Sequence, residues 1–400
     1  MASCCIAGCG PAGAVLGYLL ARAGVDVVVL EKHADFLRDF RGDTIHPSTL
    51  EILDEVGLAD AFLTLPHRKV STIMARTPSG QSVTFSLTRL HTRFPFIAFV
   101  PQWDFLEFMT REAAKCPSFR LLRNAEVVGL VERDGVVHGV TYRDADGEHE
   151  LAALVTVGAD GRSAVTRGAA KLPQVETSPP MDVLWFRVSR RSDEAEAVAG
   201  RLGAGRMLVM LDRGEYWQIA FVIPKGSAEI VRANGLDGFR RDIVATAPDL
   251  AERVNEIQDW DQVRLLTVRA DRLLRWHRPG YLAIGDAAHA MSPIGGVGIN
   301  VAIHDAVAAA NVLWRPLREG HVSDADLARV QQLREMPVRV IQTFQGFVQT
   351  RFVKPTLDAT QPPTIPLAAR LMAWIPVLRD IPPRLVAFGI RRPHVESPQL

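Results

Sequence analysis

Two periodicities of hydrophobic positions recur along the chain, one typical of strands and one typical of helices. The apolar run at 3–7 predicts a buried strand, and apolar residues then recur at helical spacing from 15 to 23. A second apolar run at 25–30 predicts another buried strand. This strand–helix–strand order predicts an α/β fold that begins with a parallel sheet.

Later segments extend the pattern into two sheets. Apolar runs and alternations predict strands at 70–85, 96–100, 119–122, 125–132, 135–143, 149–157, 183–188, 207–211, 216–223, 263–270 and 280–284. Helical spacing predicts helices at 103–115, at 164–170, within 226–259 and from about 300 to 314. Residues 173–180, which begin and end with proline, have no such period and are predicted to link the two sheets.

The composition of the 400 residues limits the class of protein. With 48% hydrophobic residues the chain can bury a large core, and its net charge of +1 provides no field that would gather nucleic acid. The four cysteines have neither a disulfide-framework spacing nor a zinc spacing, so no metal site is predicted. The sequence has no basic leader segment and no uninterrupted apolar run of membrane-spanning length, so a cytoplasmic location is expected.

The turn after the first predicted strand has the sequence GCGPAG, at 8–13. Glycines in such a turn let the backbone approach a pyrophosphate, which the N-terminus of the following helix attracts. Glu31 ends the second predicted strand and is placed to accept hydrogen bonds from ribose hydroxyls. The unit therefore predicts a dinucleotide, either FAD or NAD, whereas Glu31 would repel the 2′-phosphate of NADPH at this site.

A second glycine-rich stretch, GDAAHAMSPIGGVGIN at 285–300, lies between a predicted strand and a predicted helix. Asp286 would stand at the carboxyl edge of that strand, where open α/β sheets bind ligands. Gly295, Gly296 and Gly298 precede the helix without any lysine or arginine. A neutral ring with carbonyls and ring nitrogens, such as a flavin, suits this backbone better than a phosphate does.

Three further polar or small residues lie within this stretch or in the helix after it. His289 follows Asp286 by one turn and is predicted to be structural rather than catalytic. Asp305 and Ala306 either contribute to the site or only form the solvated and the packed faces of the helix.

Together with GADGRS at 158–163, these stretches resemble the three fingerprints of class A flavoprotein monooxygenases, the para-hydroxybenzoate hydroxylase family. The resemblance implies a Rossmann-like FAD-binding domain interleaved with a β-sheet substrate domain and followed by C-terminal helices. The expected segments are 1–70, 101–178 and 271–330 for FAD binding, 71–100 and 179–270 for the substrate domain, and 331–400 for the C-terminal helices.

The resemblance also implies cofactor contacts. Asp160 belongs to the motif that the family uses for both FAD and NAD(P)H, and Asp286 would hold the ribityl chain. The expected FAD contacts are Gly8, Gly10, Pro11, Ala12, Gly13, Glu31, Lys32, Arg41, Gln102, Val127, Asp160, Gly285, Asp286, Pro293, Gly295, Gly298, Ile299 and Asn300. The family often has two prolines where this chain has Ser292-Pro293, so the pocket on that side of the flavin is expected to differ.

The activity that the resemblance implies is oxygenation of an aromatic compound. NAD(P)H would reduce FAD, O2 would add to give a 4a-hydroperoxyflavin, and its distal oxygen would pass to an electron-rich substrate. NADPH is expected over NADH by resemblance alone. The protein would orient the substrate and exclude water, and no side chain needs to act as a nucleophile.

Substrate contacts are expected from the second sheet and from the second glycine-rich stretch. The candidates are His46, Trp185, Met207, Trp217, Phe221, Ser292 and Pro293, and none is assigned a catalytic role. For the aromatic and methionine positions, plain core packing is the alternative. No evident pair of tyrosines could deprotonate a phenol, so an apolar, multi-ring or polyketide-like substrate is expected rather than a small charged acid.

Two other functions fit parts of the sequence. WQIAFVIP at 217–224 partly resembles the WxWxIP motif of flavin-dependent halogenases, but it lacks the second tryptophan. A non-redox binding protein on the same scaffold, like the Rab GDP-dissociation inhibitors, is disfavoured by the presence of both Asp160 and Asp286.

The C-terminal segment 366–392 is apolar and interrupted by arginines. Such a segment can lie on a membrane surface, which would make the protein peripheral. Alternatively, its prolines divide it into short helices that cap the core or a partner subunit. The sequence is compatible with a monomer or a homodimer.

Overall fold

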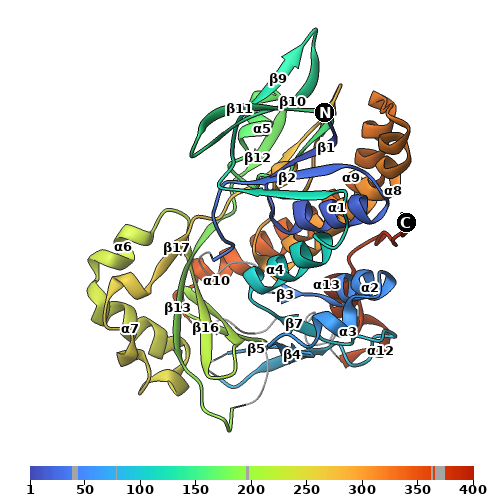
Figure 1. Ribbon diagram of the computed structural model, residues 1–400. Helices are drawn as coiled ribbons and strands as arrows, with labels where there is room; N and C mark the ends of the chain where they lie inside the picture. The colour runs from blue at the N-terminus through green and yellow to red at the C-terminus, as the bar shows by residue number, and fades with distance from the viewer. Residues whose placement is uncertain (38–43, 78, 195–197, 362–363, 365–373) are drawn as a thin grey trace.

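A computed structural model describes residues 1–37, 44–77, 79–194, 198–361, 364 and 374–400. Two large sheets dominate it, and each is assembled from segments that are far apart in the sequence (Figure 1). Helices pack against the first sheet and against both faces of the second (Figure 1). The predicted α/β fold class is therefore confirmed.

The first sheet has eight strands, and its main path runs β19-β20-β11-β1-β2-β8. Its strands are β1 (Ala2–Ala7), β2 (Val27–Glu31), β8 (Phe119–Arg123), β9 (Glu126–Arg133), β10 (Val136–Asp144), β11 (Gly147–Gly158), β19 (His277–Arg278) and β20 (Tyr281–Ala283). Nearly every residue of β1 and β2 is buried, as is typical of parallel strands covered on both faces. Because β1, β11 and β20 are parallel neighbours, their carboxyl ends meet at one edge of the sheet.

The helices around this sheet include three of the longest in the chain. They are α1 (Pro11–Arg22), α2 (Pro47–Glu55), α3 (Ala59–Phe62), α4 (Gln102–Ala113), α5 (Val165–Ala169), α8 (Gly298–Glu319) and α9 (Asp324–Val348). α1 packs against both α8 and α4, and α9 packs on the other side of α8. α8 together with the turn before it (Ile294–Glu319) is apolar and long enough to cross a membrane. However, 72% of its most apolar 18-residue stretch is buried inside the protein, so α8 is a core helix.

The second sheet has seven strands in the order β17-β13-β16-β15-β14-β5-β6. They are β5 (Thr72–Arg76), β6 (Ser82–Ser86), β13 (Met181–Ser189), β14 (Val198–Gly203), β15 (Arg206–Asp212), β16 (Tyr216–Pro224) and β17 (Arg264–Leu266). One face, called the outer face below, packs against α7 (Gly235–Thr246), where the ring of Phe239 lies 5.4 Å from Phe186 and 5.2 Å from Phe221. α7 and α6 (Ala228–Ala233) form a lobe at the lower left of Figure 1.

The opposite face, called the inner face below, is turned toward the glycine-rich stretch 285–300. Trp185, Met207 and Val222 lie on it and belong to one cluster with Ile294 of that stretch. A continuous helical segment covers this cluster: α9 passes into a π-helix, η6 (Gln349–Val353), and then into α10 (Lys354–Asp358). The inner face and the glycine-rich stretch thus bound the same region of the molecule.

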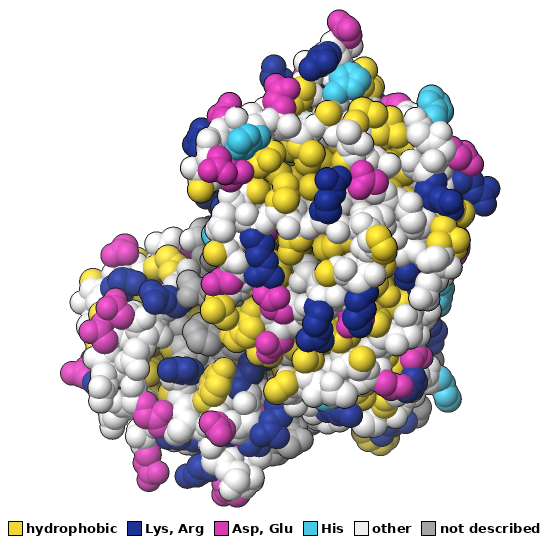
Figure 2. All heavy atoms as spheres, in the orientation of Figure 1, with side chains coloured by type: hydrophobic (Ala, Val, Ile, Leu, Met, Phe, Trp, Pro, Cys, Tyr) yellow, Lys and Arg dark blue, Asp and Glu magenta, His cyan; other side chains and the backbone are white. Residues whose placement is uncertain are grey.

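Small sheets and short helices complete the fold. They are the sheet of β3 (Thr44–Ile45), β7 (Ile97–Phe99) and β4 (Arg68–Val70), the pair β12 (Gln174–Thr177) and β18 (Ala270–Leu273), and the short helices η1 (Pro248–Leu250), η2 (Val254–Glu256), η3 (Trp260–Gln262), η4 (Gly285–Ala287), η5 (Ile294–Gly296), α12 (Pro376–Arg379) and α13 (Ile381–Phe388). Figure 2 shows acidic and basic side chains intermixed over the viewed face, with apolar side chains between them.

Two predictions about strands are wrong, and one strand was not predicted. The predicted linker 173–180 contains β12, and the strand predicted at 263–270 is divided between β17 and the start of β18, which pairs with β12. β14 was not predicted, because its sequence VAGRLG contains two glycines and has low strand propensity. In each case the strand is stabilised by a partner distant in sequence, which local periodicity does not reveal.

The C-terminal segment is only partly described, since 366–373 lie outside the described residues. Beyond them, α13 places Ala387 in a buried cluster with Val70 and Phe99, so this part caps the core. Trp374, by contrast, is 82% exposed. The membrane-surface role expected for 366–392 stays a prediction.

Candidate active site

The turn at 8–13 and the loop at 158–163 lie against each other at the carboxyl edge of the first sheet. Gly8 has φ +96°, and a Cβ there would lie 2.6 Å from the carbonyl oxygen of Ala159. A Cβ on Gly13 would lie 2.0 Å from the carbonyl oxygen of Gly8. At Gly10, in contrast, a Cβ would meet nothing within 4 Å. Two of the glycines are therefore needed for packing, and the third leaves open space beside the N-terminus of α1.

The acid that ends β2 is held beside this turn. Glu31 is buried, and its two carboxylate oxygens accept hydrogen bonds from the backbone N–H groups of Cys9 and His33, each at 3.1 Å. Val127 is buried on β9, in one cluster with residues of β1 and β2, and Lys32 is exposed. These placements are compatible with an adenosine site. Arg41, a further expected contact, lies outside the described residues.

The carboxylate of Asp160 is occupied by its own loop. It accepts hydrogen bonds from the backbone N–H and the hydroxyl of Thr166, at 2.9 and 2.8 Å. Burial raises the pKa of Asp160, and the hydrogen bonds from Thr166 oppose that rise. The Thr166 hydroxyl also contacts the Tyr281 hydroxyl of β20 at 3.0 Å. Asp160 thus fixes the turn into α5 and links it to the neighbouring strand.

Arg162 provides the basic group that the stretch 285–300 lacks. Its Nε donates to Oδ2 of Asp286 at 3.1 Å, and each side chain is about one-third exposed. Arg162 was not among the expected contacts, although it lies inside the motif GADGRS. Only the parallel pairing of β11 with β20 brings the two loops together.

The expectation that Asp305 could simply be solvated is wrong. Asp305 is fully buried and accepts hydrogen bonds from the backbone N–H of Gly285 at 3.0 Å, from His289 Nε2 at 2.6 Å and from Arg334 Nε at 2.9 Å. Burial alone would raise the pKa of Asp305, but His289 and Arg334 outweigh burial and hold that pKa below its usual value. These contacts are of the structural kind predicted for His289.

The start of α8 is tied to the segment before α2. Asn300 is buried, and its Oδ1 accepts hydrogen bonds from the His46 N–H at 3.0 Å and the Thr49 hydroxyl at 2.7 Å. The Asn300 side chain is therefore occupied by contacts within the protein, whereas the backbone N–H groups at the N-terminus of α8 stay available to a ligand. A Cβ at Gly298 would meet nothing within 4 Å, so this helix end also adjoins open space.

His46 does not have the exposure expected of a substrate contact. It is fully buried, its Nδ1 lies 2.7 Å from the carbonyl oxygen of Val386 in α13, and its Nε2 has no hydrogen-bond partner in the structure. Burial lowers the pKa of His46 from 6.5 to about 4, against the opposing effect of the Val386 hydrogen bond. His46 is thus neutral at physiological pH and joins α2 to the C-terminal helix.

The aromatic candidates on the second sheet divide between its two faces. Trp185 and Met207 lie on the inner face with Ile294. Trp217 and Phe221 belong to the cluster of the outer face: Phe221 packs on Phe239, and the Trp217 indole donates to Glu194 at 2.9 Å. Their assignment to the substrate side is wrong. Successive side chains of a strand point to opposite faces of the sheet, and both Trp217 and Phe221 point to the outer face.

Ser292 and Pro293 lie where the glycine-rich stretch approaches the inner face. Ser292 is buried, and its carbonyl oxygen accepts a hydrogen bond from Gln345 Nε2 of α9 at 2.9 Å. Gln345 Nε2 also donates to the carbonyl oxygen of Ile294 at 2.9 Å. The sequence analysis missed this contribution of α9, because its glutamines belong to no motif.

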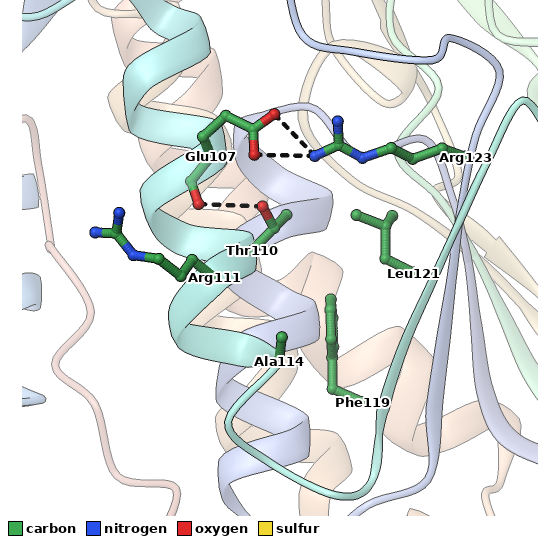
Figure 3. A pocket seen from close by; sticks show the side chains of 7 residues that line it. All are labelled: Glu107, Thr110, Arg111, Ala114, Phe119, Leu121 and Arg123. Carbon is green, nitrogen blue, oxygen red and sulfur yellow. Dashed lines mark hydrogen bonds and ion pairs between the residues drawn. The ribbon is translucent and has the colours of Figure 1, made fainter.

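A separate surface hollow of about 330 Å³ lies between α4 and β8 (Figure 3). Glu107 and Arg123 face each other across it, with Nη2 of Arg123 2.8 Å from Oε1 of Glu107. None of the three glycine motifs contributes a lining residue to it. We assign it no role in the candidate site.

The chain was compared with known families and proteins. The profile of the FAD binding domain family matches residues 1–338. The chain belongs to this family. The class A monooxygenase relationship inferred from the three motifs is thereby confirmed.

Individual relatives agree with this membership. The chain is 29% identical over 396 residues to 6-methylpretetramide 4-monooxygenase of Streptomyces rimosus, covering 98% of this chain and 94% of that protein. It is 28% identical over 324 residues to anhydrotetracycline monooxygenase of the same species, covering 78% of this chain and 61% of that protein. The OxyS anhydrotetracycline hydroxylase structure from Streptomyces rimosus has the same fold, with a TM-score of 0.75 at 21% identity, over 96% of this chain and 75% of that one.

The residues of this FAD-dependent monooxygenase fit their cofactor. Open space adjoins Gly10 at the start of α1 and Gly298 at the start of α8, where a Cβ would otherwise intrude. Helix N-termini attract the pyrophosphate and polarised flavin oxygens, and the carboxylates of Glu31 and Asp286 suit ribose and ribityl hydroxyls. The individual FAD contacts remain the assignments made from the motifs.

Gly13→Ala and Gly10→Ala form a matched pair that tests the first turn. Gly13→Ala should lower the free energy of unfolding by about 1–3 kcal/mol, because its Cβ overlaps the Gly8 carbonyl. Gly10→Ala should leave the unfolding of the FAD-free protein unchanged but raise the dissociation constant for FAD. Thermal unfolding and flavin-fluorescence titration measure the two effects. Unaltered FAD affinity in Gly10→Ala would contradict the pyrophosphate assignment.

Arg162→Gln and Asp286→Asn test the ion pair in a double-mutant cycle. Asp286→Asn should weaken FAD binding by about 1.5–3 kcal/mol, the range for hydrogen bonds to charged groups. Arg162→Gln should weaken it by about 1 kcal/mol, since solvent screens this partly exposed pair. The effects should be non-additive in titrations of the FAD-free protein. Arg143→Gln, in an exposed pair on the β10–β11 hairpin, is the control; strict additivity of the two losses would refute the coupling.

The buried, neutral His46 should make stability depend on pH. The pKa of His46 is 6.5 in the unfolded chain and about 4 in the folded protein. The stability that the neutral imidazole contributes to the folded protein is therefore fully present above pH 6.5 and is lost as the pH falls toward 4. The loss should reach about 3 kcal/mol. Chemical unfolding from pH 7 to 4.5 should show a smaller pH dependence for His46→Gln than for wild type. The exposed His321→Gln serves as control, and equal slopes in all three proteins would exclude this role.

Proposed function

We propose that this monooxygenase hydroxylates a fused-ring aromatic polyketide and uses NADPH as its reductant. The observation that carries the proposal is the similarity to 6-methylpretetramide 4-monooxygenase, which extends over 98% of this chain and 94% of that protein. Because the two proteins match over nearly their whole lengths, the match includes the second sheet, which provides the inner face, and the C-terminal helices that cover this face. The preference for NADPH rests on the family resemblance.

The inner face supports a flat, apolar substrate. Trp185, Met207 and Val209 line it together with Val222, and Ile294 of the glycine-rich stretch faces them in the same cluster. Burying an aromatic ring system among such side chains is favourable by roughly 25 cal/mol per Å² of apolar surface. A small charged acid would lose its hydration there without gaining that contribution.

The side chains of this enzyme bind and orient rather than react. Bound FAD supplies the oxygen-activating chemistry once NAD(P)H has reduced it. The loop that carries Asp286 and the backbone at the start of α8 hold the cofactor, and the inner face places the substrate ring beside it. Packing of α10 over the inner face, with Leu357 in the cluster, excludes water from this region.

An oxygen-incorporation assay tests the function. FAD-loaded enzyme is mixed with 6-methylpretetramide or anhydrotetracycline in the presence of ¹⁸O2, with NADPH or NADH. The expected result is a product that has gained one labelled oxygen atom, with reductant consumption matched to product and little hydrogen peroxide. Reductant consumption that yields only peroxide with both compounds would overturn the proposed substrate class.

The same assay distinguishes the two rival functions. A halogenase would give a chlorinated or brominated product when halide is added, without labelled oxygen. A non-redox protein would consume no reductant. Trp217, the tryptophan of the partial halogenase motif, is packed on the outer face and donates to Glu194, which gives no support to the halogenase alternative.

A further inference from the structure

One side of α9 supplies a series of hydrogen bonds to the glycine-rich stretch and its supports. Arg334 donates to Asp305, Gln342 Nε2 donates to the carbonyl oxygen of Ala290 at 3.3 Å, and Gln345 Nε2 donates to two carbonyl oxygens of the stretch. Arg334 and Gln342 are eight residues apart and Gln342 and Gln345 are three apart, so they share one side of the helix. This side of α9 is therefore directed at the loop beside the flavin ring.

Gln349 is the next polar residue on that side, four positions after Gln345. Gln349 as a whole is only 8% exposed, and no hydrogen bond to another described residue engages its carboxamide. A carboxamide that is not engaged by the protein keeps two donors and an acceptor available for a ligand. Gln349 is also the first residue of the π-helix η6, a distortion that is frequently found at functional sites.

The neighbours of Gln349 on the helix locate its side chain. Gln345, one turn before, contacts the carbonyl oxygens of Ser292 and Ile294. Val353, one turn after, is buried in the cluster of the inner face. Gln349 therefore lies between the glycine-rich stretch and the inner face, which is the region proposed for the substrate.

A second unpaired donor belongs to the same cluster. The indole Nε1 of Trp185, on the inner face, is buried and has no hydrogen-bond partner among the described residues. An otherwise apolar region thus contains one buried donor without a partner, Trp185 Nε1, and lies beside the uncommitted carboxamide of Gln349. Ligand sites commonly combine apolar walls with a few such orienting groups.

We propose that Gln349 recognises an oxygen substituent of the substrate, with its Nε2 donating a hydrogen bond to a ring carbonyl. The two preceding glutamines use Nε2 in the same way toward backbone carbonyls. Trp185 Nε1 supplies a second donor to the same ring system. This inference rests on the proposed fused-ring substrate and adds the contact that selects oxygenated rings and sets their orientation.

A pair of probes that differ only in carbonyl oxygens isolates this contact. Anthraquinone and anthracene are titrated into FAD-loaded enzyme, and their dissociation constants are obtained from the perturbed absorbance spectrum of the flavin. Wild type should prefer anthraquinone. Gln349→Leu, which keeps the size and removes the carboxamide, should bind anthraquinone about tenfold more weakly and anthracene unchanged. Trp185→Phe should reduce the same preference.

Matched controls separate recognition from folding. Gln332→Leu makes the same substitution on the exposed side of α9 and should behave as wild type. FAD affinity and unfolding temperature should be the same in all variants. If Gln349→Leu weakens both probes equally, or neither, the recognition role is refuted while the proposed function stands. If wild type binds neither probe, both the recognition role and the fused-ring proposal fail.

Discussion

The buried carboxylate of Asp305 holds together the parts of the protein on which the candidate site is built. Its charge lies in α8, while its hydrogen bonds come from the loop residues Gly285 and His289 and from Arg334 in α9. An unpaired charge at this depth would be strongly destabilising, and the three donors together compensate it. The backbone that carries Asp286 is therefore fixed to two long helices before any cofactor binds.

Close packing at two glycines likewise fixes the turn at 8–13 to the segments beside it. Gly8 and Gly13 allow the turn, the start of α1 and the loop after β11 to approach more closely than any side chain would permit. Because β1, β11 and β20 are adjacent, three segments from different parts of the chain end at one edge of the sheet. This arrangement agrees with the motif assignments, which place one elongated ligand along all three segments, with adenosine expected beside Glu31 and the flavin expected beside Asp286.

α9 connects the cofactor side of this site to the proposed substrate side. Its first half supports the loop through Arg334, its second half holds the same loop through Gln342 and Gln345, and η6 and α10 continue over the inner face of the second sheet. The outer face packs on α7, and among the described residues α9 donates no hydrogen bond to it. The outer face therefore contributes to the core, whereas the inner face is the one proposed to bind substrate.

The sequence by itself determined the α/β class, the strand–turn–helix–strand unit that ends at Glu31, and the three motifs that indicate FAD. These features are local, since periodicity and turn chemistry act over a few residues. Only the tertiary structure paired Arg162 with Asp286, buried Asp305, and assigned Trp217 and Phe221 to the outer face. Strand order, register and burial arise from contacts between residues far apart in the chain, which no local pattern specifies.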